Sequence, residues 1–333
     1  MPVERVDGRV GGSAGATAGR DAGMKEVPWD QVMVDVIMGY ECNVKCDYCS
    51  VSDRMRPHNM TTRQVLARLE DARARGVHRV SFGGGEPTIR KDLVPLVRWC
   101  RDRGFDWIKV SSNGLMYQYE DYARSIVEAG VTDPHVSAMA HTDELYESIM
   151  GLPGALGMVR KGVENLVGLG LPPALDLIIK NDTYEHLADI IEYWAAVGVR
   201  EFILWLVSLT DRNKDNLESL PRVSVMAPHI ERAFDRAAEL GVFCESRHIP
   251  RCMLKGHESF VRDLRQDLVT VVTPGSTFNL WESVISANTY TEKCKRCRYY
   301  QGECMGARND YLQRWGDDEL DPYPPEGGDS NGG

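Results

Sequence analysis

The chain has 333 residues, of which 43% are hydrophobic and 26% charged, as in a soluble globular protein with one large domain or a large domain and a small attachment. The formal net charge is −10 at pH 7, which predicts a negative surface that repels nucleic acid and anionic membranes. No apolar run approaches the roughly 20 residues that a membrane span requires. We therefore expect neither nucleic acid nor a membrane as a partner.

The first segment, residues 1–28, is rich in Gly and Ala and lacks the apolar core of a secretory signal. We expect a disordered leader and a cytoplasmic protein. The chain has nine cysteines, and in a reducing compartment these favour metal or redox chemistry over a disulfide framework.

From residue 29 onward, short apolar runs alternate with amphipathic stretches. Strands are predicted at Val32–Met38, Val77–Phe82, Trp107–Ser111, Val136–Met139, Ala174–Ile179, Glu201–Val207 and Val242–Glu245. Helices are predicted at Thr61–Arg75, Asp92–Arg103, Tyr119–Glu128, Ala155–Leu169, Tyr184–Val197 and Ala227–Leu240, the first opening with a capping box of Thr61 and Gln64. Successive βα units indicate parallel strands, because parallel pairing requires crossover helices. This pattern alone does not separate an open sheet from a barrel.

The first predicted strand runs into a C-x3-C-x2-C triplet formed by Cys42, Cys46 and Cys49. Three thiolates at this spacing suit three corners of a 4Fe–4S cluster, and the fourth iron is then left to bind an exogenous chelator. A structural zinc site is the alternative. Such a site usually has four protein ligands, and His58 is the nearest candidate for the fourth.

Two polar strand ends follow. Gly83-Gly84-Gly85-Glu86-Pro87 comes after the second strand, where glycines let a ligand approach the backbone and a carboxylate accepts hydrogen bonds from an ammonium group. The third strand ends in Ser111-Ser112-Asn113-Gly114, for which a plain Asn-Gly turn is the alternative.

The cysteine triplet, with the aromatic Tyr48 before its third cysteine, and the glycine segment behind it resemble the signature of the radical S-adenosylmethionine (radical SAM) superfamily. The resemblance covers about residues 32–245. It implies an α/β fold, a partial (β/α)6 TIM-type barrel with its site at the C-terminal ends of the strands. It also implies that Cys42, Cys46 and Cys49 hold a 4Fe–4S cluster whose open iron is chelated by SAM.

The same resemblance implies a set of SAM contacts. The glycine segment would meet the SAM amino group, Tyr48 would lie near the adenine and Ser137 near the ribose. The implied set is Tyr48, Gly84, Gly85, Glu86, Ser111, Asn113, Ser137 and Lys180. A solvated strand-end lysine is the alternative for Lys180. Ala138-Met139-Ala140-His141 departs from the Asp-Gly pair that many relatives carry after the fourth strand. No catalytic side chain is predicted.

The alternating pattern breaks at about Arg247. We therefore expect a leader at 1–28, a core barrel at 29–246, a small cysteine-rich C-terminal appendage at 247–316 and a disordered acidic tail at 317–333. Within the appendage, Cys252, Cys294, Cys297 and Cys304 resemble the distal half of a SPASM/twitch extension, which implies an auxiliary 4Fe–4S cluster. The six residues between Cys297 and Cys304 depart from the usual spacing, and a zinc ribbon is the alternative. Cys100 and Cys244 are interpreted as buried apolar residues.

The resemblance implies reductive cleavage of SAM to a 5′-deoxyadenosyl radical that abstracts hydrogen from a substrate, with a flavodoxin- or ferredoxin-type electron donor. One hypothesis is a maturase that acts on a ribosomally synthesised peptide, aided by a separate peptide-recognition partner. A second is a small-molecule dehydrogenase or mutase of secondary metabolism. A third is a non-enzymatic Fe–S electron carrier or zinc protein, which would not produce 5′-deoxyadenosine.

Overall fold

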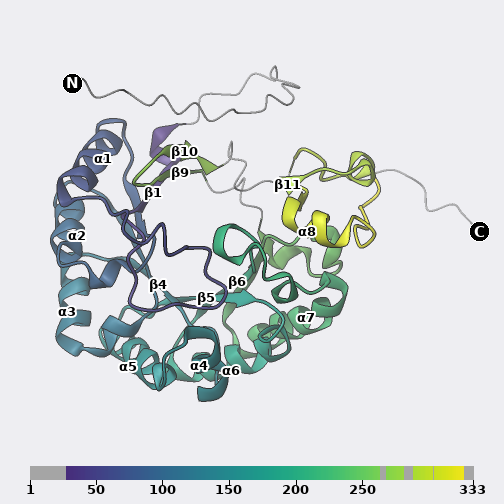
Figure 1. Ribbon diagram of the computed structural model, residues 1–333, viewed down its shortest axis with the longest axis horizontal. Helices are drawn as coiled ribbons and strands as arrows, with labels where there is room; N and C mark the ends of the chain where they lie inside the picture. The colour runs from purple at the N-terminus through teal and green to yellow at the C-terminus, as the bar shows by residue number, and fades with distance from the viewer. Residues whose placement is uncertain (1–27, 263–267, 281–287, 303, 326–333) are drawn as a thin grey trace, which may run out of the picture.

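The computed structural model describes residues 28–262, 268–280, 288–302 and 304–325. Ten strands form one sheet in the order β10-β9-β1-β2-β3-β4-β5-β6-β7-β8, and the helices lie on its outer side (Figure 1). The strands from β9 to β8 are parallel to one another, while β10 runs antiparallel beside β9. The sheet curves into a partial barrel with β10 and β8 at its two edges. This architecture confirms the predicted α/β class and the partial barrel.

The central strands are β1 (Met33–Ile37), β2 (Arg79–Gly83), β3 (Trp107–Ser112), β4 (Asp133–Ser137), β5 (Ala174–Ile179), β6 (Glu201–Leu206) and β7 (Phe243–Arg247). The helices are α1 (Thr62–Ala74), α2 (Leu93–Asp102), α3 (Glu120–Ala129), α4 (Asp143–Met150), α5 (Ala155–Gly168), α6 (Leu187–Val197) and α7 (Val223–Leu240). The predicted capping box is present at the start of α1, where Thr61 and Gln64 bond reciprocally. No helix in the described ranges combines the length and the apolarity needed to cross a membrane.

Several elements differ from the predictions; helix α7, for example, begins at Val223, four residues before the predicted start. Strand β4 begins at Asp133, three residues before the predicted start, because the polar side chains of Asp133 and His135 face the barrel interior and hide the apolar pattern. Helix α4 has no counterpart among the predicted elements. It is short, and the Thr142 side chain caps it by accepting a hydrogen bond from the Leu145 amide at 3.4 Å.

The segment after β7 divides between the sheet and the appendage. Strands β8 (Val261–Arg262), β9 (Val269–Val272) and β10 (Thr277–Asn279) extend the sheet, although all three fall in the range expected for the appendage. The hairpin of β11 (Asn288–Thr289) and β12 (Ala307–Arg308) and helix α8 (Asn309–Trp315) make up the appendage proper. The single boundary expected at residue 247 therefore does not describe the packing.

Part of the expected tail is also packed. Leu320 is buried against Cys294 and Ala307, and the Tyr311 hydroxyl donates a hydrogen bond to Glu319. Residues 317–325 are therefore a packed part of the appendage, because they supply apolar cover for its cysteines. The expected leader (apart from Pro28) and residues 326–333 lie outside the described residues.

Along each strand, successive side chains point alternately towards the helices and into the barrel interior. In β3, for example, Ile108 and Val110 are buried against the helices, while Lys109 and Ser111 line a cavity of about 650 Å³ inside the barrel. We call this cavity the lumen. Its wall includes many ionisable side chains, so the barrel interior is polar.

Candidate functional site

The predicted cluster cysteines lie on the loop between β1 and α1, which crosses the centre of the view in Figure 1. Arg56 folds this loop by donating hydrogen bonds to the carbonyl oxygens of Cys42 at 3.1 Å and Val44 at 3.0 Å. The side-chain oxygen of Asn59 accepts hydrogen bonds from the amides of Tyr40 at 3.0 Å and Glu41 at 3.2 Å. Side chains of the loop thus hold its backbone in shape.

The three thiols are half-buried and electrostatically coupled. Burial, together with the neighbouring Cys49 and Cys42, raises the pKa of Cys46 to about 12. Burial is also the main reason that the pKa of Cys42 is raised. Thiols that disfavour their own ionisation this strongly become thiolates when a metal supplies positive charge. The donor set therefore fits an iron–sulfur cluster.

Tyr48 lies against the same sulfur atoms. Its pKa is raised by burial and then by the adjacent Cys46 and Cys49. The phenol is therefore neutral beside the cluster ligands. The expected place of Tyr48 near the adenine of SAM stays a prediction.

The glycine segment packs directly on the cysteine loop. A Cβ atom on Gly85 would come within 2.0 Å of the Glu41 carbonyl oxygen, and one on Gly84 within 2.2 Å of the Gly39 carbonyl oxygen. Gly84 also has a φ of +120°, which favours glycine. The amides of Gly85 and Glu86 each donate a 2.8 Å hydrogen bond to this loop. Close backbone packing thus requires these glycines even before a ligand is considered.

Glu86 makes internal hydrogen bonds with both carboxylate oxygens. Oε1 accepts from the Thr88 amide at 2.9 Å, the Thr88 hydroxyl at 2.5 Å and the Ser112 hydroxyl at 2.9 Å, while Oε2 accepts from the Asn113 amide at 2.7 Å. Burial nevertheless raises the pKa of this carboxyl group. The Glu86 carboxylate therefore joins the ends of β2 and β3. This role was not anticipated, because the sequence suggested only a contact with an ammonium group.

Asn113 connects β3 to the cysteine loop. Its side-chain amide donates to Asn43 Oδ1 at 2.8 Å, and its oxygen accepts from the Leu115 amide at 3.1 Å. Ser111 lines the lumen on the same strand, and Ser137 lies half-buried at the end of β4. The expected SAM contacts are thus distributed over the C-terminal ends of neighbouring strands.

Lys180 is the most deeply buried charge at this end of the barrel, with 2% of its side chain exposed. Its ammonium group donates to Asp47 Oδ2 at 2.8 Å and pairs with Asp182. Asp47 stands between Cys46 and Tyr48, so Lys180 ties β5 to the cysteine loop. The solvated lysine weighed as an alternative does not describe this buried ion pair.

The lumen below this end of the barrel contains a charged network that the sequence did not reveal. His135 lies between Asp176 at 3.1 Å and Asp133 at 3.4 Å, and the Trp205 indole donates to Asp176 Oδ1 at 2.8 Å. Burial alone would lower the pKa of His135, but the neighbouring carboxylates raise it overall. Burial likewise opposes ionisation of Asp176, yet His135 holds its pKa below the usual range. His135, Asp176 and Trp205 meet because β4, β5 and β6 pair side by side in the sheet.

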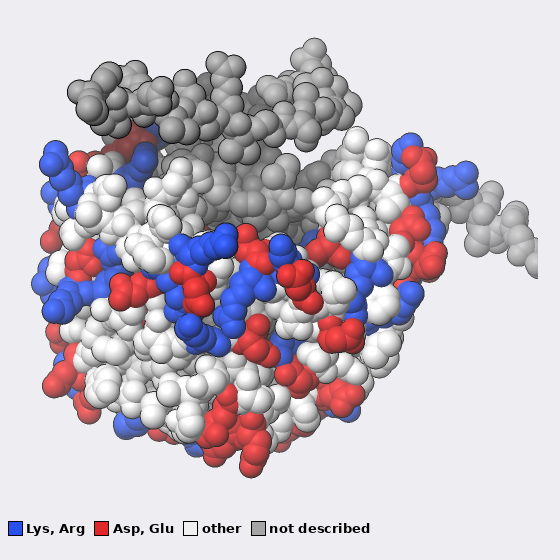
Figure 2. All heavy atoms as spheres, in the orientation of Figure 1, with Lys and Arg blue, Asp and Glu red and all other residues white. Residues whose placement is uncertain are grey.

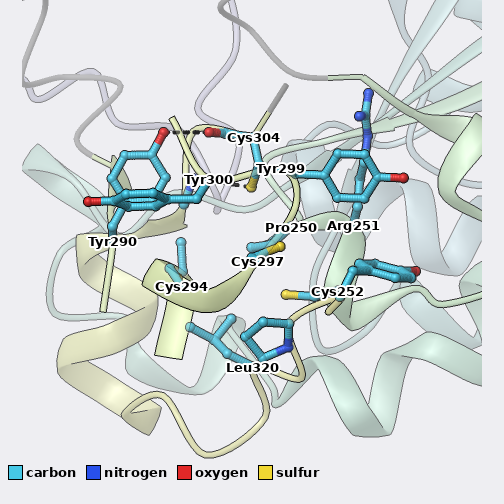
Figure 3. A pocket seen from close by; sticks show the side chains of 14 residues that line it. Pro250, Arg251, Cys252, Tyr290, Cys294, Cys297, Tyr299, Tyr300, Cys304 and Leu320 are labelled. Carbon is cyan, nitrogen blue, oxygen red and sulfur yellow. Dashed lines mark hydrogen bonds between the residues drawn. The ribbon is translucent and has the colours of Figure 1, made fainter. Parts of the chain in front are cut away.

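The second cysteine group gathers around a small pocket in the appendage (Figure 3). Burial and then the nearby Cys304, Cys294 and Cys297 raise the pKa of Cys252 to about 12. The thiols thus lie within electrostatic reach of one another, although Cys252 stands 42 residues before Cys294. This arrangement fits a single metal site with four thiolate ligands.

Tyrosine rings surround this pocket. Tyr290 and Tyr300 meet edge to face at a centroid distance of 4.8 Å, and the Tyr290 hydroxyl donates to the Cys304 carbonyl oxygen at 2.5 Å (Figure 3). Tyr299 and Tyr323 form a second pair at 5.4 Å. The Gly306 amide donates to the Cys304 sulfur at 3.3 Å. The rings limit the access of water to the thiols, which suits an iron–sulfur cluster or a closed zinc site.

Comparison with protein families identifies the cysteine-loop region. The model of the "Radical SAM superfamily" matches residues 36–200. This region of the chain is a radical SAM superfamily domain. The domain implies SAM and a 4Fe–4S cluster as cofactors, and the matched range contains the cysteine loop and the glycine segment.

Among curated proteins, the radical SAM region resembles enzymes described as probable GTP 3′,8-cyclases. It is 29% identical over 165 residues to that of Methanococcus aeolicus, covering 48% of this chain and 54% of the relative. It is 26% identical over 171 residues to that of Saccharolobus solfataricus, covering 51% of this chain and 54% of the relative. The matched region thus spans about half the length of these relatives.

Among solved structures, the fold resembles two enzymes over most of the chain. Streptococcus suis SuiB bound to S-adenosylmethionine has a TM-score of 0.66 at 14% identity, covering 89% of this chain and 76% of that one. The enzyme anSMEcpe with bound AdoMet has a TM-score of 0.61 at 15% identity, covering 87% of this chain and 93% of that one. At these identities the likeness concerns the fold, including the cysteine-containing C-terminal region.

Proposed function

We propose that the protein cleaves SAM reductively and uses the resulting radical to modify a ribosomally synthesised peptide. The observation that carries the first part is the group of Cys42, Cys46 and Cys49 on one loop, packed against the glycine segment. Cys42, Cys46 and Cys49 would hold a 4Fe–4S cluster, which in its reduced form would supply one electron to split SAM into methionine and a 5′-deoxyadenosyl radical. That radical would take a hydrogen atom from the substrate and leave as 5′-deoxyadenosine.

The side chains of this protein would hold the site in place for that chemistry. Arg56 fixes the carbonyl groups of the cysteine loop, and Lys180 anchors Asp47 within it. Glu86 aligns the ends of β2 and β3, and Asn113 joins β3 to the loop. Such fixed contacts limit reorganisation during the reaction, which is how proteins contribute to cofactor chemistry.

Two observations support a peptide substrate. SuiB has also been solved bound to precursor peptide SuiA, with a TM-score of 0.62 to this chain, and anSMEcpe with a Kp18Cys peptide, with a TM-score of 0.61. The exposed face in Figure 2 mixes both signs of charge, so it offers no patch of uniformly positive charge to a polyanion.

The second candidate is a reaction on GTP, favoured by the cyclases that match the radical SAM region. More generally, this alternative includes a dehydrogenase or mutase that acts on another small molecule. In either case, four thiolates from Cys252, Cys294, Cys297 and Cys304 would leave an auxiliary site without an open position. Such a site favours electron relay or structural support over substrate binding.

The electron donor in this proposal is a flavodoxin- or ferredoxin-type protein, and a separate protein would recognise the peptide. The substrate is tested by measuring 5′-deoxyadenosine formation in reconstituted protein given either GTP or a short peptide encoded beside its gene. Stimulation by the peptide, with a matching mass change, supports the proposal. A new product from GTP, with no effect of the peptide, would overturn the peptide assignment.

A further inference from the structure

Outside both cysteine groups, the chain brings together three side chains that commonly bind metals. One ring nitrogen each from His141 and His186 and one carboxylate oxygen from Asp189 lie within 4.8 Å of one another. His141 follows β4, in the segment that departs from the radical SAM pattern. His186 directly precedes α6 and Asp189 lies in its first turn; helix α6 is in the lower part of Figure 1.

Among the residues that the structure describes, these three groups have few hydrogen-bond partners. The Nδ1 atom of His141 is buried and meets no hydrogen-bond partner in that part of the chain, which is costly for a polar atom. Within the described ranges, the His186 ring and the Asp189 carboxylate also make no side-chain hydrogen bond. The two imidazole rings are 5.5 Å apart between centroids and tilted by 49°, so they do not form a parallel stack. A shared ligand would account for this proximity.

The backbone that carries the three groups is already ordered. The fully buried Trp194 of α6 donates its indole N–H to the Ala140 carbonyl oxygen at 3.1 Å. This bond holds the residue before His141 against the helix that carries Asp189. The two parts of the cluster are thus held together by a contact that does not involve any of the three side chains.

The local charge favours a cation. Asp189 also borders a surface groove of about 520 Å³ between α6 and α7, whose ionisable side chains are Asp189, Glu192, Asp235 and Glu239 against Arg232 and Arg236. Arg236 is already paired with Glu192 at 3.1 Å and Glu239 at 2.7 Å. Four carboxylates against two guanidinium groups leave a negative potential beside the imidazoles.

We propose that His141, His186 and Asp189 bind one divalent transition-metal ion of the Zn²⁺ type, leaving one coordination position open. Two imidazole nitrogens and a carboxylate oxygen are ligands that zinc accepts, and tetrahedral bonds of about 2.0–2.1 Å place ligand atoms about 3.3 Å apart. The present spacing is up to 4.8 Å, so the proposal requires the side chains to rotate towards one another when the ion binds. The bound ion ties the segment after β4 to α6. This site does not depend on the identity of the radical SAM substrate.

The test uses the full chain with both cysteine sites loaded with iron and sulfide, so that thiols do not compete for zinc. Equilibrium dialysis at micromolar free Zn²⁺ should give one bound zinc per chain. His141→Ala and His186→Ala should each weaken binding at least tenfold, as should Asp189→Asn, which alters only an exposed side chain. The matched control is His229→Ala, which changes a half-buried histidine on the neighbouring α7.

Co²⁺ provides a second readout, because a site of imidazole and carboxylate lacks the thiolate-to-cobalt charge-transfer band of a cysteine site. After the spectrum of the loaded wild-type chain without cobalt is subtracted, d–d absorption should remain without that band, and zinc should raise the thermal midpoint of the wild-type chain by several degrees. Equal zinc affinity in the wild-type chain and the three variants would overturn the proposal. Failure of the loaded wild-type chain to bind zinc or cobalt at micromolar concentration would also overturn it.

Discussion

Replacing Lys180 by methionine is expected to loosen the loop that carries the cluster cysteines. The buried ammonium group lies 2.8 Å from Asp47 and also pairs with Asp182, whereas Met keeps most of the volume but removes the charge. Asp47 immediately follows Cys46, so losing this pair releases the loop from β5. Asp47→Asn removes the same interaction from the other side and provides the second arm of a double-mutant cycle.

The size of the effect follows from distance and burial. Two unit charges 2.8 Å apart attract by about 6 kcal/mol at an effective dielectric constant of about 20. Desolvation of the ammonium offsets several kcal/mol of this, and solvent screens Asp47, whose side chain is 39% exposed. We therefore expect a coupling energy of about 1–3 kcal/mol between the two residues.

The assay is urea unfolding of the reduced, metal-free chain under anaerobic conditions, for the wild type, both single variants and the double variant. Lys161→Met, which changes an exposed lysine on α5, is the control and should have little effect. Additive effects of Lys180→Met and Asp47→Asn, within about 0.3–0.5 kcal/mol, would refute the ion-pair reasoning. A loss of SAM affinity in Lys180→Met alone would instead support the direct contact expected from the sequence.

Three further predictions concern the rest of the molecule. Glu86→Gln should preserve the iron content but weaken SAM binding several-fold, because an amide group facing the Asn113 N–H disrupts the joined ends of β2 and β3. Unchanged SAM affinity would mean that Gly83–Pro87 is only a turn. Cys252→Ala should remove the auxiliary metal and lower the thermal midpoint, while SAM cleavage driven by dithionite survives. Metal analysis of this variant should show that about four irons are lost rather than about one zinc. His135 has a raised pKa in the folded chain, so the stability of the wild-type protein should fall as the pH rises above about 6.5. Unfolding measured as a function of pH should show this fall in the wild type and not in His135→Gln.

The elements that the sequence predicted well are those with a strong local pattern. Strand β5 occupies Ala174–Ile179 as predicted, because five of its six residues are apolar and only Asp176 interrupts them, and the capping box fixed the start of α1. The strands after β7 were missed, because two to four residues are too few to show a period, and β9 is held by pairing with β1 from the other end of the chain.

The contacts of the candidate site likewise fall into those that the sequence could predict and those that it could not. The spacing of the cysteines was sufficient to group Cys42, Cys46 and Cys49, because their proximity is set by the loop itself. Lys180 and Asp47, in contrast, are 133 residues apart and meet only because β5 and the loop after β1 reach the same end of the barrel. The hydrogen bonds of Glu86 to Ser112 and Asn113 likewise depend on adjacent parallel strands. Such contacts have no signal in a single sequence.

The central claim is tested most directly by assaying SAM cleavage after anaerobic reconstitution with iron and sulfide. Dithionite-reduced wild-type protein should convert SAM to methionine and 5′-deoxyadenosine, and Cys100→Ala, which alters a buried cysteine of α2, should do the same. The triple variant Cys42→Ala, Cys46→Ala, Cys49→Ala should form no 5′-deoxyadenosine while retaining the metal of the appendage. Continued formation of 5′-deoxyadenosine by the triple variant would contradict the account.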